Sequence, residues 1–144
     1  MAAKDPVLAR REAVVEICEG AANTVITRVV DEAVRAANIF GLTKERATAY
    51  ADGILGTLPQ AYEAIKMPDG AEREARIDAL ALSVRGVSSA HHVPRLVERG
   101  LTAIAIRIAR EVVRRNADER GFTPDELEHE FIDFADRLQE RLNA

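Results

Sequence analysis

The chain is poor in the residues that build several common kinds of site. It has one cysteine, Cys18, and no tryptophan among its 144 residues. A single thiol excludes an intramolecular disulfide and any zinc or iron–sulfur site built from several thiolates. Aromatic residues make up only 4% of the chain, so there are few side chains on which nucleic-acid bases could stack.

Long apolar runs and a basic excess are also missing. The longest strongly apolar stretch is Leu101–Ile106, whereas a membrane-spanning helix needs about 20 such residues. The first residues have no basic stretch followed by an apolar core, so they do not form a secretory signal. Lysine and arginine number 20 against 24 aspartates and glutamates, which gives 20 − 24 = −4. We therefore expect a cytoplasmic protein that binds neither membranes nor nucleic acid.

Apolar residues make up 47% of the sequence, and they recur at three- and four-residue steps that are typical of helices. This spacing predicts a single all-α domain over residues 1–144 with six or seven helices. Asp5 and Pro6 predict the start of the first helix. That helix should run to about Asn38, and Gly20 suggests a split near residues 19–23.

Capping residues, prolines and glycines predict the other boundaries. Thr43 can cap a second helix, and a capping box at Thr123 opens the last helix at Pro124. Between them, Pro59 should end or bend a helix near Leu58, and a turn should fall at residues 67–70. The next helix should cover Ala71–Arg85 and end at Gly86. Ser88 or Ser89 should then cap a helix that ends near Asn116.

Few side chains suggest catalysis. The sequence has no Gly-x-Ser-x-Gly motif, phosphate-binding loop or dinucleotide fingerprint. Cys18 lies on an apolar helix face, where burial would raise the pKa of its thiol and reduce its reactivity. We therefore predict that the protein is not an enzyme and holds no catalytic residues.

Two groups of residues offer alternatives with a metal. Glu126 and His129 form a Glu-x-x-His pair on one helix face, as di-iron carboxylate bundles require. Such a site needs a second pair and two further glutamates. His91 and His92 are the other candidates: one of them could ligate a haem iron, or both could be surface residues where a helix opens.

One stretch resembles a known family. Residues 85–94, Arg-Gly-Val-Ser-Ser-Ala-His-His-Val-Pro, continue into an amphipathic helix with Leu101 and Ile104. This stretch resembles the junction before the penultimate helix of bacterial single-domain haemoglobins and flavohaemoglobin globin domains. The Gly86-Val87 turn before a long helix is also similar to the non-haem globin-like sensor domains of bacterial stressosome regulators. The resemblance implies a globin-like bundle.

The same resemblance places residues around a haem pocket. Phe40 is similar to the phenylalanine that globins set against the haem, and the distal positions fall near Ile26 and Tyr50. The position of the proximal histidine is occupied by Leu82, which has no lone pair for iron. Because no histidine lies between Met1 and Ala90, a small error in register would not supply one.

The resemblance therefore implies a haem-free globin-fold regulatory or sensory protein without a cofactor. A small apolar ligand, a regulatory protein partner or a homodimer would carry its signal. The ligand pocket would be lined by Val25, Ile26, Phe40, Tyr50, Ile54 and Leu82. The last two helices could form a dimer seam or fill the core of one subunit through Ile104, Ile108, Val112, Phe131, Phe134 and Leu138. The alternatives are a haem protein that binds a diatomic gas through His91 or His92, and a di-iron bundle.

Overall fold

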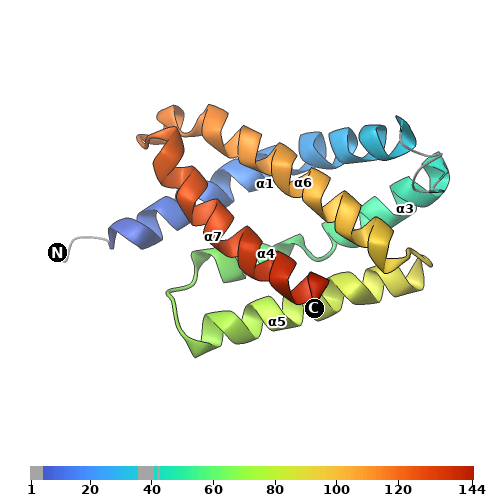
Figure 1. Cartoon of the computed structure of the whole chain (residues 1–144). Helices are drawn as coiled ribbons and strands as arrows, with labels where there is room; N and C mark the ends of the chain where they lie inside the picture. Colours follow the sequence, from blue (N-terminus) through green and yellow to red (C-terminus); the bar gives the residue numbers. More distant parts are fainter. Residues whose placement is uncertain (1–4, 36–40, 42) are drawn as a thin grey trace.

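The computed structural model describes residues 5–35, 41 and 43–144, and this part of the chain is helical with no strand (Figure 1). The prediction of an all-α protein is therefore confirmed. The elements are α1 (Pro6–Arg35), α3 (Lys44–Leu55), α4 (Leu58–Lys66), α5 (Ala71–Ala90), α6 (Arg95–Asn116), the 3-10 helix η1 (Asp118–Arg120) and α7 (Pro124–Asn143).

Three predicted helix starts are confirmed by capping hydrogen bonds. The Asp5 carboxylate accepts from the amide of Val7 at 2.8 Å, just before α1. The hydroxyl oxygens of Thr43 and Thr123 each accept, at 3.2 Å, from an amide three residues along the chain. Such bonds satisfy amides that have no partner within the helix. The predicted end of the first helix near Asn38 lies outside the described residues.

Two glycines do not interrupt helices as predicted. Helix α1 passes through Gly20 without a break, and α5 continues through Gly86 to Ala90. Glycine inside a helix costs only about 1 kcal/mol, and packing of the last turn of α5 offsets this. Val87 lies so close to Gly53 of α3 that a Cβ there would be 2.6 Å from Val87 Cγ1. A single methyl group at Gly53 would force the two helices apart.

The start of α6 also differs from the prediction. Ser88 and Ser89 lie inside α5 and cap nothing, and the next helix begins at Arg95, directly after Pro94. Between the helices, His92 has a left-handed φ of 53°, which reverses the chain direction. The second helix likewise ends at Leu55, earlier than predicted. Pro59 then lies in the first turn of a separate helix, α4, where its missing amide costs least.

The long helices α1, α6 and α7 cross one another (Figure 1). The shorter helices α3 and α4 both pack against α1 and α5. Helix α1 packs against both α6 and α7, and α6 packs along α7. Helix α5 contacts α7, α4 and α3 on the other side of the bundle. Within the described residues, no helix is both long enough and apolar enough to cross a membrane.

Apolar side chains form two clusters. The larger one joins α1, α4, α5, α6 and α7 and includes the predicted stripe of α7, with Leu127, Phe131 and Phe134. The smaller one joins α1, α3 and the start of α6 around Tyr50. The residues suggested as a dimer seam lie mostly inside the subunit, because Ile108, Phe131 and Phe134 are buried. They fill the core of one subunit.

Two buried arginines tie the helices together at the α4–α5 turn. Arg11 on α1 is 3% exposed, and its Nε donates to the Glu130 carboxylate of α7 at 3.1 Å. Its other nitrogens donate to the Met67 carbonyl at 2.6 Å and to Asp69 at 2.9 Å. Arg73 on α5 also donates to Asp69, at 3.2 Å. The hydrogen bond from Arg11 holds the pKa of Asp69 below its usual range.

Replacement of Arg11 by methionine should therefore destabilise the protein strongly. It leaves the buried Glu130 carboxylate without its partner, and such a loss costs about 3–5 kcal/mol. Arg10→Met, one residue earlier on α1, is the control, because the Arg10–Glu126 pair at 3.7 Å is 33% and 40% exposed and should contribute at most about 1 kcal/mol. Urea unfolding measures both. Equal losses in the two variants would contradict the role given to Arg11.

Candidate functional site

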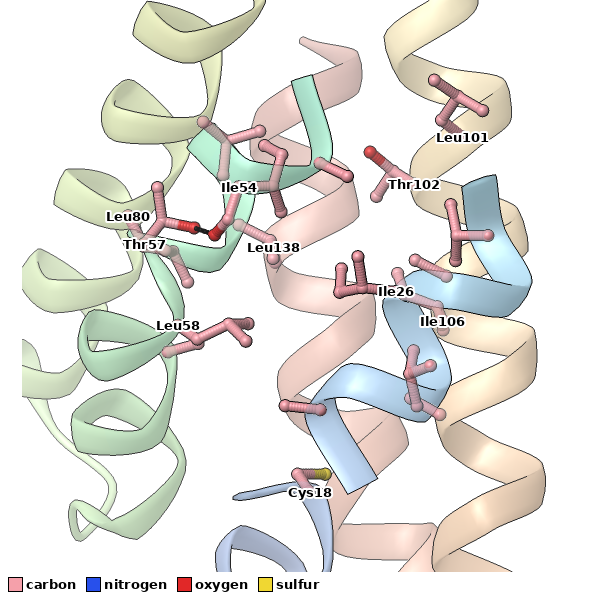
Figure 2. A pocket seen from close by; sticks show the side chains of 18 of the residues that line it. Cys18, Ile26, Ile54, Thr57, Leu58, Leu80, Leu101, Thr102, Ile106 and Leu138 are labelled. Atoms are coloured by element: carbon pink, nitrogen blue, oxygen red, sulfur yellow. Dashed lines mark hydrogen bonds between the residues drawn. The ribbon is translucent and has the colours of Figure 1, made fainter. Parts of the chain in front are cut away.

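A cavity of about 200 Å³ lies inside the bundle, and all six described helices contribute to its walls (Figure 2). Ile26 of α1, Leu58 of α4 and Leu138 of α7 point into it from different sides (Figure 2). An apolar cavity of about 150 Å³ in another protein stays free of water and binds benzene. The cavity therefore has room for a molecule that contains one or two small rings.

Small residues on α1 and α6 leave this space open. Ala22 and Ala33 lie on the cavity face of α1, and Ala105 and Ala109 lie on that of α6. Ala105 and Ala109 are four positions apart and so share a helix face, and each of the four alanines supplies less bulk than a leucine would. Alanines at inward positions of α1 and α6, two helices in direct contact, therefore contribute to the open space.

The cavity wall is almost entirely hydrocarbon. No described lining residue carries a charge, and the few polar side chains are Cys18, Tyr50, Thr57, Tyr62 and Thr102. The Thr57 hydroxyl donates to the Ile54 carbonyl at 2.7 Å (Figure 2), and the Tyr50 hydroxyl is hydrogen-bonded to Ser88 at 2.9 Å. Water in such a cavity would find few partners. A neutral apolar molecule fits these walls, whereas a charge in contact with them would be unpaired.

Four of the six residues predicted to line a pocket lie in this wall: Val25, Ile26, Tyr50 and Ile54. Phe40, the fifth, lies outside the described residues. That these side chains bind a ligand stays a prediction.

The placement of Leu82 was wrong. Its side chain is 67% exposed and does not line the cavity. The inward positions of α5 are Ile77, Leu80 and Val84, and Leu82 lies two residues from the last two, so it faces the opposite side of the helix. The position that the resemblance assigned to the iron ligand is therefore on the surface. The count from Gly86 falls on a position that the helical spacing of α5 turns outward.

The histidines do not reach the cavity either. Among the described residues that line it there is no histidine. The His91 ring lies edge-on to Tyr50 with centroids 6.4 Å apart, at the end of α5, and His92 is exposed in the turn that follows. Neither imidazole is placed to ligate a group held in the cavity.

The di-iron alternative also lacks a ligand set. Glu126 forms an ion pair with Arg10 at 3.7 Å, and His129 is exposed on α7. No group of three or more potential metal-ligating side chains occurs within the described residues. The Glu-x-x-His pair therefore stands alone on the surface of the described structure.

Sequence reasoning missed half of the cavity wall and every buried charge. The wall residues of α4, Leu58, Ala61 and Tyr62, were not predicted. Arg11, Arg73, Glu98 and Glu130 are all buried, although charged residues are seldom fully buried. One signal was available: Arg11 is three residues before Val14 and Arg73 four before Ile77, so each lies on an apolar helix face.

Comparisons with known proteins give no match: no family model, curated protein or solved structure is similar to this chain. The geometry of the chain itself is therefore the basis for any functional proposal.

Cys18 provides a direct test of the cavity environment. Burial and the nearby charge of Glu19 raise the pKa of its thiol to about 12. The sequence predicted that burial would raise this pKa. Because the thiolate is the reactive form, we expect iodoacetamide to modify the native protein at pH 8 at least roughly a thousandfold more slowly than an exposed thiol. The protein unfolded in guanidinium is the control and should react at the ordinary rate. A native rate within about tenfold of that value would contradict the buried position of the thiol.

Proposed function

We propose that the protein binds a small, neutral, largely apolar molecule in the cavity. The observation that carries this proposal is a cavity of about 200 Å³ whose described walls hold no charge. Empty apolar space is costly, at about 24 cal/mol per Å³ in core-truncation variants. A ligand that fills the space gains contacts with residues already turned inward, so little reorganisation is needed.

We propose further that occupancy of the cavity is a regulatory signal rather than a step in catalysis. A ligand that touches helices far apart in the sequence binds better to one helix arrangement than to another, and it shifts the population toward that arrangement. The thiol of Cys18 has a raised pKa, so it supplies neither a base nor an activated nucleophile. The output in this proposal is association with a second copy or with a regulatory protein partner.

A haem-free, globin-like arrangement belongs to the same proposal. Its support is that long helices cross around an apolar cavity, with α1 against α6 and α7, as globin helices pack around the haem pocket. The described chain has six such helices, where a globin has about eight.

A cavity-filling variant tests the binding proposal. We expect 1-methylnaphthalene to bind at one equivalent, with its fluorescence read directly because the chain has no tryptophan. Ala105→Phe fills the cavity from α6 and should weaken binding by at least about tenfold, because the ring occupies the space of the ligand. The control is Ala103→Phe, two residues away on the exposed side of α6.

The proposed ligand site is wrong if the native protein does not bind the probe, or if the two variants weaken binding equally. Circular dichroism establishes that each variant is folded. Ala22→Phe, which fills the cavity from α1, repeats the test should Ala105→Phe fail to fold.

The regulatory part has a separate test. Native mass spectrometry of the freshly purified protein, with and without saturating 1-methylnaphthalene, reports subunit number and any co-purified molecule. We expect the ligand to change the ratio of monomer to dimer, because only a ligand with different affinities for two states shifts their populations. Ala105→Phe should show no such change on addition of the probe. Binding without any change in subunit number would contradict self-association as the output.

A further inference from the structure

Glu98 is a buried residue whose carboxyl oxygen Oε1 has no hydrogen-bond partner among the described residues. It lies near the start of α6 and is 1% exposed. Its Oε1 accepts no hydrogen bond from any described residue. The other buried charged side chains have ionic partners: Arg11 and Glu130 form an ion pair at 3.1 Å and Arg73 donates to Asp133 at 3.1 Å, although Arg73 Nη2 also has no hydrogen-bond partner. A buried carboxylate oxygen with no donor is costly, so we expect its donor to come from outside the described residues.

The position of Glu98 continues one wall of the cavity. On α6 the residues three, four and seven positions further along, Leu101, Thr102 and Ala105, all line the cavity. These spacings place Glu98 on the same helix face, one turn beyond the last lining residue. The neighbours of Glu98 on α6, Val97 and Leu101, belong to the smaller apolar cluster around Tyr50.

Tyr50 connects Glu98 to the cavity. Its ring lines the wall from α3, and its hydroxyl is hydrogen-bonded to Ser88 of α5 at 2.9 Å. Burial raises the pKa of the Tyr50 phenol, the bond to Ser88 lowers it, and the negative charge of Glu98 raises it. Of these three residues, Tyr50 lines the cavity, whereas Ser88 and Glu98 are buried without being part of the lining.

The arginines nearest in sequence are occupied elsewhere. Arg95 donates to the Leu142 carbonyl at 3.2 Å, and Arg99 donates to the Asn143 carbonyl at 3.1 Å. Both therefore bind the end of α7 and leave Glu98 unpaired. The partner of the carboxylate should be a cationic donor that enters from outside.

On the basis of the function proposed above, we propose that the ligand is an apolar amine whose ammonium group binds the Glu98 carboxylate. The hydrocarbon part lies in the cavity, and the head group passes beside Tyr50. Glu98 is not itself among the lining residues, so its side chain turns toward the cavity as the ligand enters. An ammonium supplies both the missing donor and the opposite charge, whereas a carboxylate ligand would repel Glu98.

Three probes with the same ring system test this class. They are 1-methylnaphthalene, 1-naphthylmethylamine, which is protonated at pH 7, and 1-naphthoate. With the native protein we expect the amine to bind about tenfold or more tighter than the hydrocarbon, the gain typical of a hydrogen bond to a charged group. The naphthoate should bind weakest.

Variants then locate the effect. Glu98→Gln keeps the shape but removes the charge, so it should abolish the preference for the amine and leave the affinity for 1-methylnaphthalene unchanged. The matched control is Glu111→Gln on the same helix, because Glu111 pairs with Arg28 at 3.6 Å on the surface. It should keep the full preference. Tyr50→Phe, which retains the ring, should reduce the preference in part.

The outcomes separate the two proposals. If 1-methylnaphthalene binds the native protein and the amine has no advantage, the amine proposal is overturned and the apolar site stands. If none of the probes binds, the proposed function itself fails. An amine preference that survives Glu98→Gln would overturn the assignment to Glu98. If that variant does not fold, the amine preference of the native protein and its partial reduction in Tyr50→Phe decide the matter.

Discussion

The hydrogen bonds of Arg11 are the constraint on which the rest of the structure depends. One guanidinium group joins α1 to the α4–α5 turn and to α7 through Glu130, Met67 and Asp69. These elements carry much of the cavity wall. Helices that line a cavity of about 200 Å³ pack less tightly there than they would around a filled core. Directional bonds to a planar guanidinium fix the spacing of the helices in a way that apolar contacts alone do not, because apolar attraction has no preferred direction.

The buried charges of this bundle divide into two kinds. Arg11 and Arg73 are surrounded by acceptors from several helices, and their role is to hold those helices in place. Glu98 has the same degree of burial and no donor for its Oε1. Its negative charge raises the pKa of the Tyr50 phenol, which lines the cavity and is hydrogen-bonded to Ser88. The contrast between paired and unpaired charges of equal burial distinguishes a structural role from a ligand-binding one.

Local signals in the sequence were reliable where hydrogen bonds span three or four residues. The starts of α3 and α7 follow from Thr43 and Thr123, because a hydroxyl at the cap bonds an amide three residues away whatever the rest of the chain does. Gly86 misled for the opposite reason. Its local cost is small, and contacts from α3, with Gly53 against Val87 and Tyr50 against Ser88, keep the helix intact to Ala90. Leu82, which the resemblance placed in the pocket, is exposed because it lies two residues from both Leu80 and Val84 on the inward face of α5.

The sequence by itself determined the all-α class, most helix starts and the apolar faces of α1, α5 and α7, because periodicity and capping are properties of short segments. Only the tertiary structure decided where space remains and which charges are enclosed. The cavity wall includes Ala22 and Ala33 of α1 and Ala105 and Ala109 of α6, and whether such small residues leave a void depends on the size of the side chains that the other helices bring to the same place. Whether an arginine or glutamate on an apolar face is paired depends on groups more than fifty residues away, as Arg11 with Glu130 and the unpaired Glu98 illustrate.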